Sequence, residues 1–147
     1  MAGDRLVVTA APRRYPPLPM PTVAFDGIRA EIVTAYPGAT PELMDYAVQL
    51  GSRVVVLAGT GVGNAGPGFA DAVKRAAGKG CIVVLSTRVP WGPIVPTYGN
   101  GGGIDLVASG AIPAGDLNPF QARILAAVLL SCGTGPEEFP AAFKTYC

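Results

Sequence analysis

The sequence predicts an α/β protein with three layers, in which helices cover both faces of a small parallel sheet of the Rossmann or flavodoxin-like kind. Residues 53–59 and 81–87 are apolar runs of strand length, which is typical of parallel strands covered on both faces. A third β-rich stretch, residues 28–36, precedes them, and helical patterns separate the three. The order strand, helix, strand, helix, strand requires crossover connections and therefore predicts parallel pairing.

Composition supports one globular domain and excludes several kinds of partner. The chain has 147 residues, of which half are hydrophobic, enough for a sizeable core. Its net charge is +1 and only 14% of its residues are charged, so it has no basic stripe for a nucleic acid. Its apolar runs are too short to cross a bilayer. We expect neither a nucleic-acid partner nor a membrane span.

Metal and disulfide chemistry are also disfavoured. Histidine is absent, which removes the commonest metal ligand and the commonest general base. Cys81, Cys132 and Cys147 are odd in number and form no C-x-x-C pair, as expected of reduced thiols. The N-terminus does not have the order of a signal peptide. We therefore expect a cytoplasmic protein whose chemistry does without imidazole.

The first 22 residues differ from the rest of the chain. They are rich in proline, and after a possible short strand at residues 6–9 they predict a linker or an extended arm. The globular domain is predicted over residues 23–147.

Helix signals follow the first two strands. Thr40 precedes Pro41, which predicts an N-cap and a first helical residue. This helix should run to about Leu50, with Leu43, Ala47 and Leu50 on one face. A second helix should start at Pro67, with an apolar face that is formed by Phe69, Val73 and Ala77.

The region after the third strand divides into a long loop and two helices. Residues 89–103 are rich in glycine and proline and have no period, which favours a functional loop. Asn118 and Pro119 then predict the start of a helix. The apolar face of that helix is predicted from Phe120, Ile124, Ala127, Val128 and Ser131. A short helix over residues 136–146 should close the chain.

A glycine-rich loop follows the strand at residues 53–59. Gly61, Gly63 and Gly66 match the dinucleotide pattern G-x-G-x-x-G between a strand and a helix. The next strand, however, ends in Ser86-Thr87-Arg88, without the carboxylate that holds the ribose in such units. Arg88 would suit a phosphorylated ribose, so a free-standing nucleotide-binding or small-ligand module remains the alternative.

Asn64 is the second candidate in this loop. Loops at the carboxyl edge of parallel sheets carry ligand sites, and the Asn64 amide offers both a donor and an acceptor. Two structural explanations compete with a ligand-binding role. One is a left-handed backbone conformation at Asn64, and the other is a cap on the following helix.

Four segments together resemble one enzyme family. They are YPG at 36–38, LAGTGVGN at 57–64, STRVPWG at 86–92 and GGGIDLVASGAIPAGDLNPFQARILAAVLL at 101–130. From about residue 23 onward the chain resembles the C-terminal domain of bacterial L-asparaginases of the asparaginase/glutaminase family.

The resemblance implies a homotetrameric amidohydrolase that converts L-asparagine and water to L-aspartate and ammonia through an acyl-enzyme, with no metal or cofactor. In the family, a larger N-terminal domain carries the nucleophilic Thr and a second Thr with Asp and Lys partners. The resemblance also implies that the smaller domain lends residues to the site of a neighbouring subunit. Asn64 matches the family's Asn that reaches the substrate, with Gly61 and Gly63 shaping its loop.

The sequence departs from the family pattern in two respects. The nucleophile motifs are absent, and residues 98–104 contain no acid where several members carry a substrate-facing Glu. Asp105 instead matches the family's structural DL pair. Thr60, Thr87 and Thr97 have no evident activating base, so we predict no catalytic residue in this chain. We expect it to be inactive alone and to complete the substrate site within a homo-oligomer.

Overall fold

A computed structural model describes residues 15–147. Residues 1–14, including the possible strand at 6–9, lie outside this described part. The model contains one four-stranded sheet in the order β1-β2-β3-β4 with parallel pairing throughout. The strands are β1 (Ala30–Thr34), β2 (Val54–Gly59), β3 (Ile82–Thr87) and β4 (Ile112–Pro113). The predicted parallel α/β fold is confirmed.

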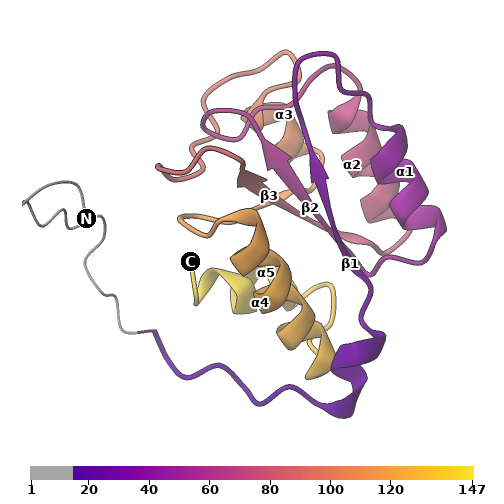
Figure 1. Ribbon diagram of the computed structural model, residues 1–147, viewed down its shortest axis with the longest axis vertical. Helices are drawn as coiled ribbons and strands as arrows, with labels where there is room; N and C mark the ends of the chain where they lie inside the picture. The colour runs from indigo at the N-terminus through magenta and orange to yellow at the C-terminus, as the bar shows by residue number, and fades with distance from the viewer. Residues whose placement is uncertain (1–14) are drawn as a thin grey trace, which may run out of the picture.

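The helices divide between the two faces of the sheet (Figure 1). One face is covered by α1 (Glu42–Gln49), α2 (Phe69–Gly78) and α3 (Gly103–Ala108). The other face is covered by α4 (Pro119–Ser131) and α5 (Phe139–Lys144). Crossovers between neighbouring parallel strands share one hand. The three helices that connect sequential strands therefore lie on the same face, and the C-terminal helices must supply the other.

The two central strands form the centre of the core. Every residue of β2 and β3 is buried, which explains why both read as apolar runs. Alternate side chains face opposite helix layers. Val55 and Val83 pack with α1, α2 and α3, whereas Val54 and Ile82 pack with α4 and α5. The prediction that residues 54–56 and 82–85 form the core is confirmed.

The first helix differs from the prediction at its start and on its face. Pro41, not Thr40, is the N-cap, and no side chain caps the helix. Met44 and Ala47 are buried, whereas Leu43 is 63% exposed and Leu50 is 43% exposed. The i, i+4 pattern therefore identified a face that lies at the open side of the sheet, because β1 is an edge strand with no neighbour beyond it.

The predicted faces of α2 and α4 are each partly right. In α2, Phe69 and Val73 are buried as expected, but Ala77 is exposed. In α4, Ala127, Val128 and Ser131 are buried as predicted. Phe120 is 73% exposed and Ile124 is 45% exposed. The sheet-facing stripe of α4 instead runs through Ala122, Leu125, Ala126 and Leu129.

Three short elements have no counterpart in the sequence prediction. They are η1 (Val23–Gly27), α3 and β4. Each is at most six residues long, too short for a periodic pattern to be visible in the sequence. Helix α3 begins inside the glycine run of the long loop, so that loop ends at Gly102 rather than at Gly103.

The arm at residues 15–22 contains no helix or strand and runs beside the C-terminal helices (Figure 1). The Thr22 hydroxyl donates to the Ser131 carbonyl at 2.6 Å. The Tyr146 hydroxyl donates to the Pro17 carbonyl at 3.3 Å. These contacts fix the arm against the domain, while its role as a linker stays a prediction.

Candidate functional site

The loop after β2 is a closed turn. The Thr60 N–H donates to the Asn64 carbonyl at 2.7 Å, and the Asn64 N–H donates back to the Thr60 carbonyl at 2.9 Å. Between them, Gly61 and Gly63 have φ angles of 53° and 102°, a region that L-residues other than Gly rarely adopt. The two glycines therefore allow the tight turn and hold Asn64 at the carboxyl edge of the sheet.

The end of β3 fastens this turn from the side. Thr87 is 5% exposed, and its hydroxyl donates to the Gly61 carbonyl at 2.6 Å. The same hydroxyl accepts from the Val89 N–H at 3.1 Å. Thr87 thus joins the two loops that leave β2 and β3. The sequence suggests Thr87 only as a candidate nucleophile, although a hydroxyl beside a glycine turn also suits such a bridge.

The long loop packs beneath the turn. The Val95 N–H donates to the Val62 carbonyl at 3.1 Å. Ile94 is buried against Gly63 so closely that a Cβ on Gly63 would lie 3.1 Å from two Ile94 carbons. Trp91 and Tyr98 of the same loop are 69% and 59% exposed. The loop therefore combines a buried anchor with aromatic side chains at the open edge.

Asn64 adopts neither of the two structural roles that competed with ligand binding. Among the described non-glycine residues only Asn100 has a positive φ, and the N-cap of α2 is Gly68. The Asn64 Oδ1 instead accepts from the Gly103 N–H at 3.1 Å. The Asn64 side chain is half-buried, and its Nδ2 donates to no other residue in the described part of the chain. The contact with Gly103, 39 residues away, had no signal in the sequence.

A hollow of about 490 Å³ opens beside this turn. Its walls are residues 35–40, which follow β1, together with Thr60 and residues 65–67. The segment YPG at 36–38 and the glycine loop, both part of the resemblance, thus meet at the same edge. The lining contains hydroxyl and backbone groups but no acid, lysine or arginine.

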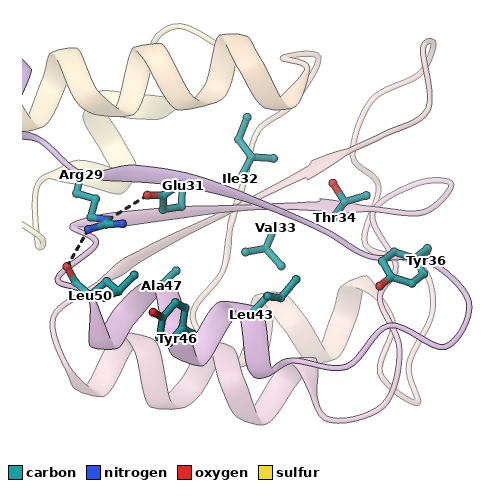
Figure 2. Close-up of a pocket in the computed structure, with 10 residues that line it drawn as sticks. All are labelled: Arg29, Glu31, Ile32, Val33, Thr34, Tyr36, Leu43, Tyr46, Ala47 and Leu50. Carbon is teal, nitrogen blue, oxygen red and sulfur yellow. Dashed lines mark hydrogen bonds and ion pairs between the residues drawn. The ribbon is translucent and has the colours of Figure 1, made fainter.

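A second hollow, of about 450 Å³, lies between the edge strand β1 and α1 (Figure 2). Arg29 lies at one end, where its Nε is 3.0 Å from the Glu31 Oε1. Tyr36 lies at the other end and also lines the first hollow. Leu43, Tyr46 and Leu50 form its helical wall. This groove is mainly apolar, and its acid, Glu31, is paired with Arg29.

The three threonines considered as nucleophiles all point at backbone. The hydroxyls of Thr60, Thr87 and Thr97 donate to the carbonyls of Asn64, Gly61 and Val95. None of them has an acid or an amine as a hydrogen-bond partner in the described part of the chain. The lysines lie on or at the ends of α2 and α5, as expected.

Asp105 holds the glycine run instead of facing the open edge. Its Oδ2 accepts from the Gly101 N–H at 2.7 Å. The structure thus places the acid nearest to the 98–104 segment in a contact within that loop, in agreement with the structural DL match. The position of a substrate-facing acid remains without a counterpart here.

The turn differs from a dinucleotide loop. In such units the glycines lead directly into the helix whose N-terminus meets the phosphates. Here Thr60 and Asn64 close the turn on itself, and α2 begins only at Phe69. The strand order runs 1-2-3-4 without a reversal, whereas doubly wound sheets bind nucleotides where the order reverses. Both features favour the small-ligand interpretation of the edge.

Two of the three thiols are buried or partly buried. Burial raises the pKa of the Cys81 thiol to about 11. Burial, followed by the carboxylate of Asp116, raises the pKa of Cys147 to about 11.

Within residues 15–147, no cluster of three or more Cys, Asp or Glu side chains is arranged to hold a metal. No helix there is long and apolar enough to span a membrane.

Comparison with known proteins identifies the family. The glutaminase/asparaginase C-terminal domain model matches residues 29–143. A "Probable L-asparaginase" of Deinococcus radiodurans is 40% identical over 116 residues, which are 78% of this chain and 35% of that protein. A component of the glutamyl-tRNA(Gln) amidotransferase of Thermofilum pendens is 28% identical over 116 residues, 78% of this chain and 25% of that protein.

A solved structure agrees with these relatives. The "Probable Cytoplasmic L-asparaginase" of Campylobacter jejuni superposes with a TM-score of 0.67 at 28% identity, and the match covers 81% of this chain and 37% of that one. The chain thus spans about a third or less of the length of the two curated relatives. It belongs to the glutaminase/asparaginase family, and residues 29–143 form the C-terminal domain of that family.

Proposed function

We propose that this chain is the C-terminal part of an asparaginase-type amidohydrolase, which converts L-asparagine and water to L-aspartate and ammonia. In this proposal Asn64 forms one wall of the substrate site of a neighbouring subunit. The observation that carries it is the position of Asn64, half-buried at the carboxyl edge, with an Nδ2 that donates to none of residues 15–147. The 40% identity to a protein named as a probable L-asparaginase supports the substrate.

The contacts of the threonine hydroxyls support a nucleophile that lies outside this chain. Amide hydrolysis through an acyl-enzyme needs a nucleophile and a base that activates it. The hydroxyls of Thr60, Thr87 and Thr97 are engaged with backbone carbonyls. The nucleophile therefore comes from an N-terminal asparaginase domain, to which residues 1–22 serve as the linker or arm. The proposal includes a homo-oligomeric, cytoplasmic enzyme without a metal or a cofactor, and no activity of this chain alone.

The relatives named as glutamyl-tRNA(Gln) amidotransferases define a second substrate to test. Their identity to this chain, 28% in the Thermofilum protein, is below that of the Deinococcus protein, which favours L-asparagine. Parallel assays with L-asparagine and L-glutamine separate the two. A higher kcat/KM for L-glutamine would overturn the substrate assignment but not the amidohydrolase class.

The test is reconstitution with a catalytic domain. The 147-residue chain is mixed with the N-terminal domain of the Deinococcus relative, and ammonia release from L-asparagine is measured. We expect hydrolysis from the mixture and none from this chain alone. Asn64→Ala should lower kcat/KM, whereas Gln49→Ala, which removes an exposed amide from α1, should not. Hydrolysis by the chain alone, or equal rates for both variants, would contradict the proposal.

A further inference from the structure

The orientation of the Asn64 amide is set by a backbone donor. A side-chain amide has an acceptor oxygen at one end and a donor nitrogen at the other, and these are often hard to distinguish. Here the group that faces the Asn64 side chain is the Gly103 N–H, at 3.1 Å. Because a backbone N–H can only donate, the atom that faces it must be Oδ1. The nitrogen is therefore turned away from α3.

The start of α3 lies close to the Asn64 carbonyl oxygen as well as donating a hydrogen bond to it. Gly102 is buried, and a Cβ there would lie 2.9 Å from Oδ1 and 2.4 Å from the Tyr98 carbonyl oxygen. The start of α3 thus presses against this oxygen.

The nitrogen end of the amide lies beside Gly61. A Cβ on Gly61 would lie 4.0 Å from the Asn64 Nδ2, and Gly61 itself is exposed. Nδ2 donates to no residue in the part of the chain that the structure covers. The two N–H donors of this nitrogen therefore lie on the side of the exposed Gly61, away from Gly103.

We infer that Asn64 contacts its ligand only as a hydrogen-bond donor, through Nδ2. This inference rests on the proposed function. The group that it recognises is an acceptor oxygen, for which a carboxylate is the strongest partner. An ammonium or amide N–H of the ligand is not recognised by Asn64. The sequence alone allowed Asn64 to act toward a ligand as a donor or as an acceptor. The contact with Gly103 occupies the acceptor oxygen and leaves the donor role.

Two substitutions at position 64 separate a donor from an acceptor. Asn64→Asp keeps an oxygen for the Gly103 N–H and replaces the NH₂ group by a second, negatively charged oxygen. Asn64→Ala removes both ends. If Asn64 acts only as a donor, Asn64→Asp should weaken ligand binding as Asn64→Ala does, because the Asp carboxylate repels a carboxylate of the ligand. An acceptor contact to an ammonium group predicts that Asp is tolerated or improves binding.

The first measurement uses the 147-residue chain and amide hydrogen exchange by NMR. The Gly103 N–H should be protected in the wild type and in Asn64→Asp and should exchange faster in Asn64→Ala. Gln49→Ala serves as the control and should match the wild type. Equal exchange rates of the Gly103 N–H in the wild type and in Asn64→Ala would overturn the inference that the Asn64 amide has a fixed orientation. Retained protection elsewhere in the sheet shows that each variant is folded.

The second measurement uses the mixture with the N-terminal domain. Asn64→Asp should raise the KM for L-asparagine at least as much as Asn64→Ala, by roughly tenfold or more, because one hydrogen bond to a charged group is lost. A KM for Asn64→Asp at or below the wild-type value would overturn the donor-only role. If the mixture hydrolyses no L-asparagine, the proposed function fails, and Gly103 exchange alone then decides whether the amide is fixed.

Discussion

At the scale of single residues, the buried hydroxyl of Thr87 holds two loops together. It donates to the Gly61 carbonyl and accepts from the Val89 N–H. Thr87→Val keeps the shape of the side chain but leaves both backbone groups without this partner. We expect a loss of about 1–3 kcal/mol in the free energy of unfolding, measured by urea denaturation. Thr87→Ser should recover most of it, and equal midpoints for Val and wild type would contradict the bridge.

Gly102 is required for space rather than for backbone freedom. Its φ of −84° is ordinary for any residue, yet a Cβ there would lie 2.4 Å from the Tyr98 carbonyl oxygen. Gly102→Ala should therefore destabilise the domain by about 1–3 kcal/mol, the usual cost of overpacking. Gly27→Ala is the matched control, because nothing lies within 4 Å of its Cβ position. Equal melting temperatures for the two variants would contradict this packing.

At the scale of elements, the start of α4 combines several local signals in one place. The Asn118 Oδ1 accepts from the N–H groups of Phe120 and Gln121, and the Gln121 Oε1 accepts from the Asn118 N–H. Asn118→Ala should cost about 1 kcal/mol of unfolding free energy. Asn118→Ser should keep most of the cap. Denaturation curves for the two variants test this, and a neutral Ala substitution would show that packing alone fixes the helix start.

The elements also show which features the sequence determines locally. Strands β2 and β3 and the start of α4 were predictable because their signals lie within a few residues. The exposure of Leu43 and Phe120 was not predictable from the sequence. It depends on where the sheet ends and on which side of each helix packs against it. The i, i+4 spacing reports that a helix has an apolar stripe, but it does not report whether that stripe is covered.

At the scale of the whole molecule, the three-layer arrangement separates the cysteines by reactivity. Cys132 is exposed, whereas the pKa values of Cys81 and Cys147 are raised to about 11 by burial. At pH 8 roughly one in a thousand of these two thiols is a thiolate. Iodoacetamide at pH 8 should therefore label Cys132 first, as read by mass spectrometry.

Raising the pH toward 10 should increase labelling of Cys147 in the folded chain, because its thiolate fraction grows as the pH approaches the raised pKa. Denaturation in urea at pH 8 should make all three cysteines react. Labelling of Cys81 as fast as Cys132 in the folded chain would contradict the burial of β3 and its flanking residues.

The candidate site was predictable in its position but not in its internal geometry. A strand followed by a glycine loop placed Asn64 at the carboxyl edge, and the resemblance supplied a role for it. The contacts of Asn64 with Gly103, and of Gly61 with Thr87, join residues that are far apart in the sequence. Such long-range contacts form only when the strands align in the folded sheet, so no local sequence pattern predicts them.

The central claim is that the edge carrying Asn64 completes a site on a neighbouring subunit, and mixed oligomers test it most directly. In both assemblies the N-terminal domain is joined covalently to this chain, so that the two cannot exchange within one subunit. One assembly carries Asn64→Ala with an intact N-terminal domain, and the other carries this chain unchanged with the N-terminal nucleophilic Thr replaced by Ala. Each should hydrolyse L-asparagine poorly alone. Dissociating and reassembling them together should restore ammonia release, because some sites then combine an intact Thr with an intact Asn64. Mixed assemblies no more active than their parents would contradict the claim.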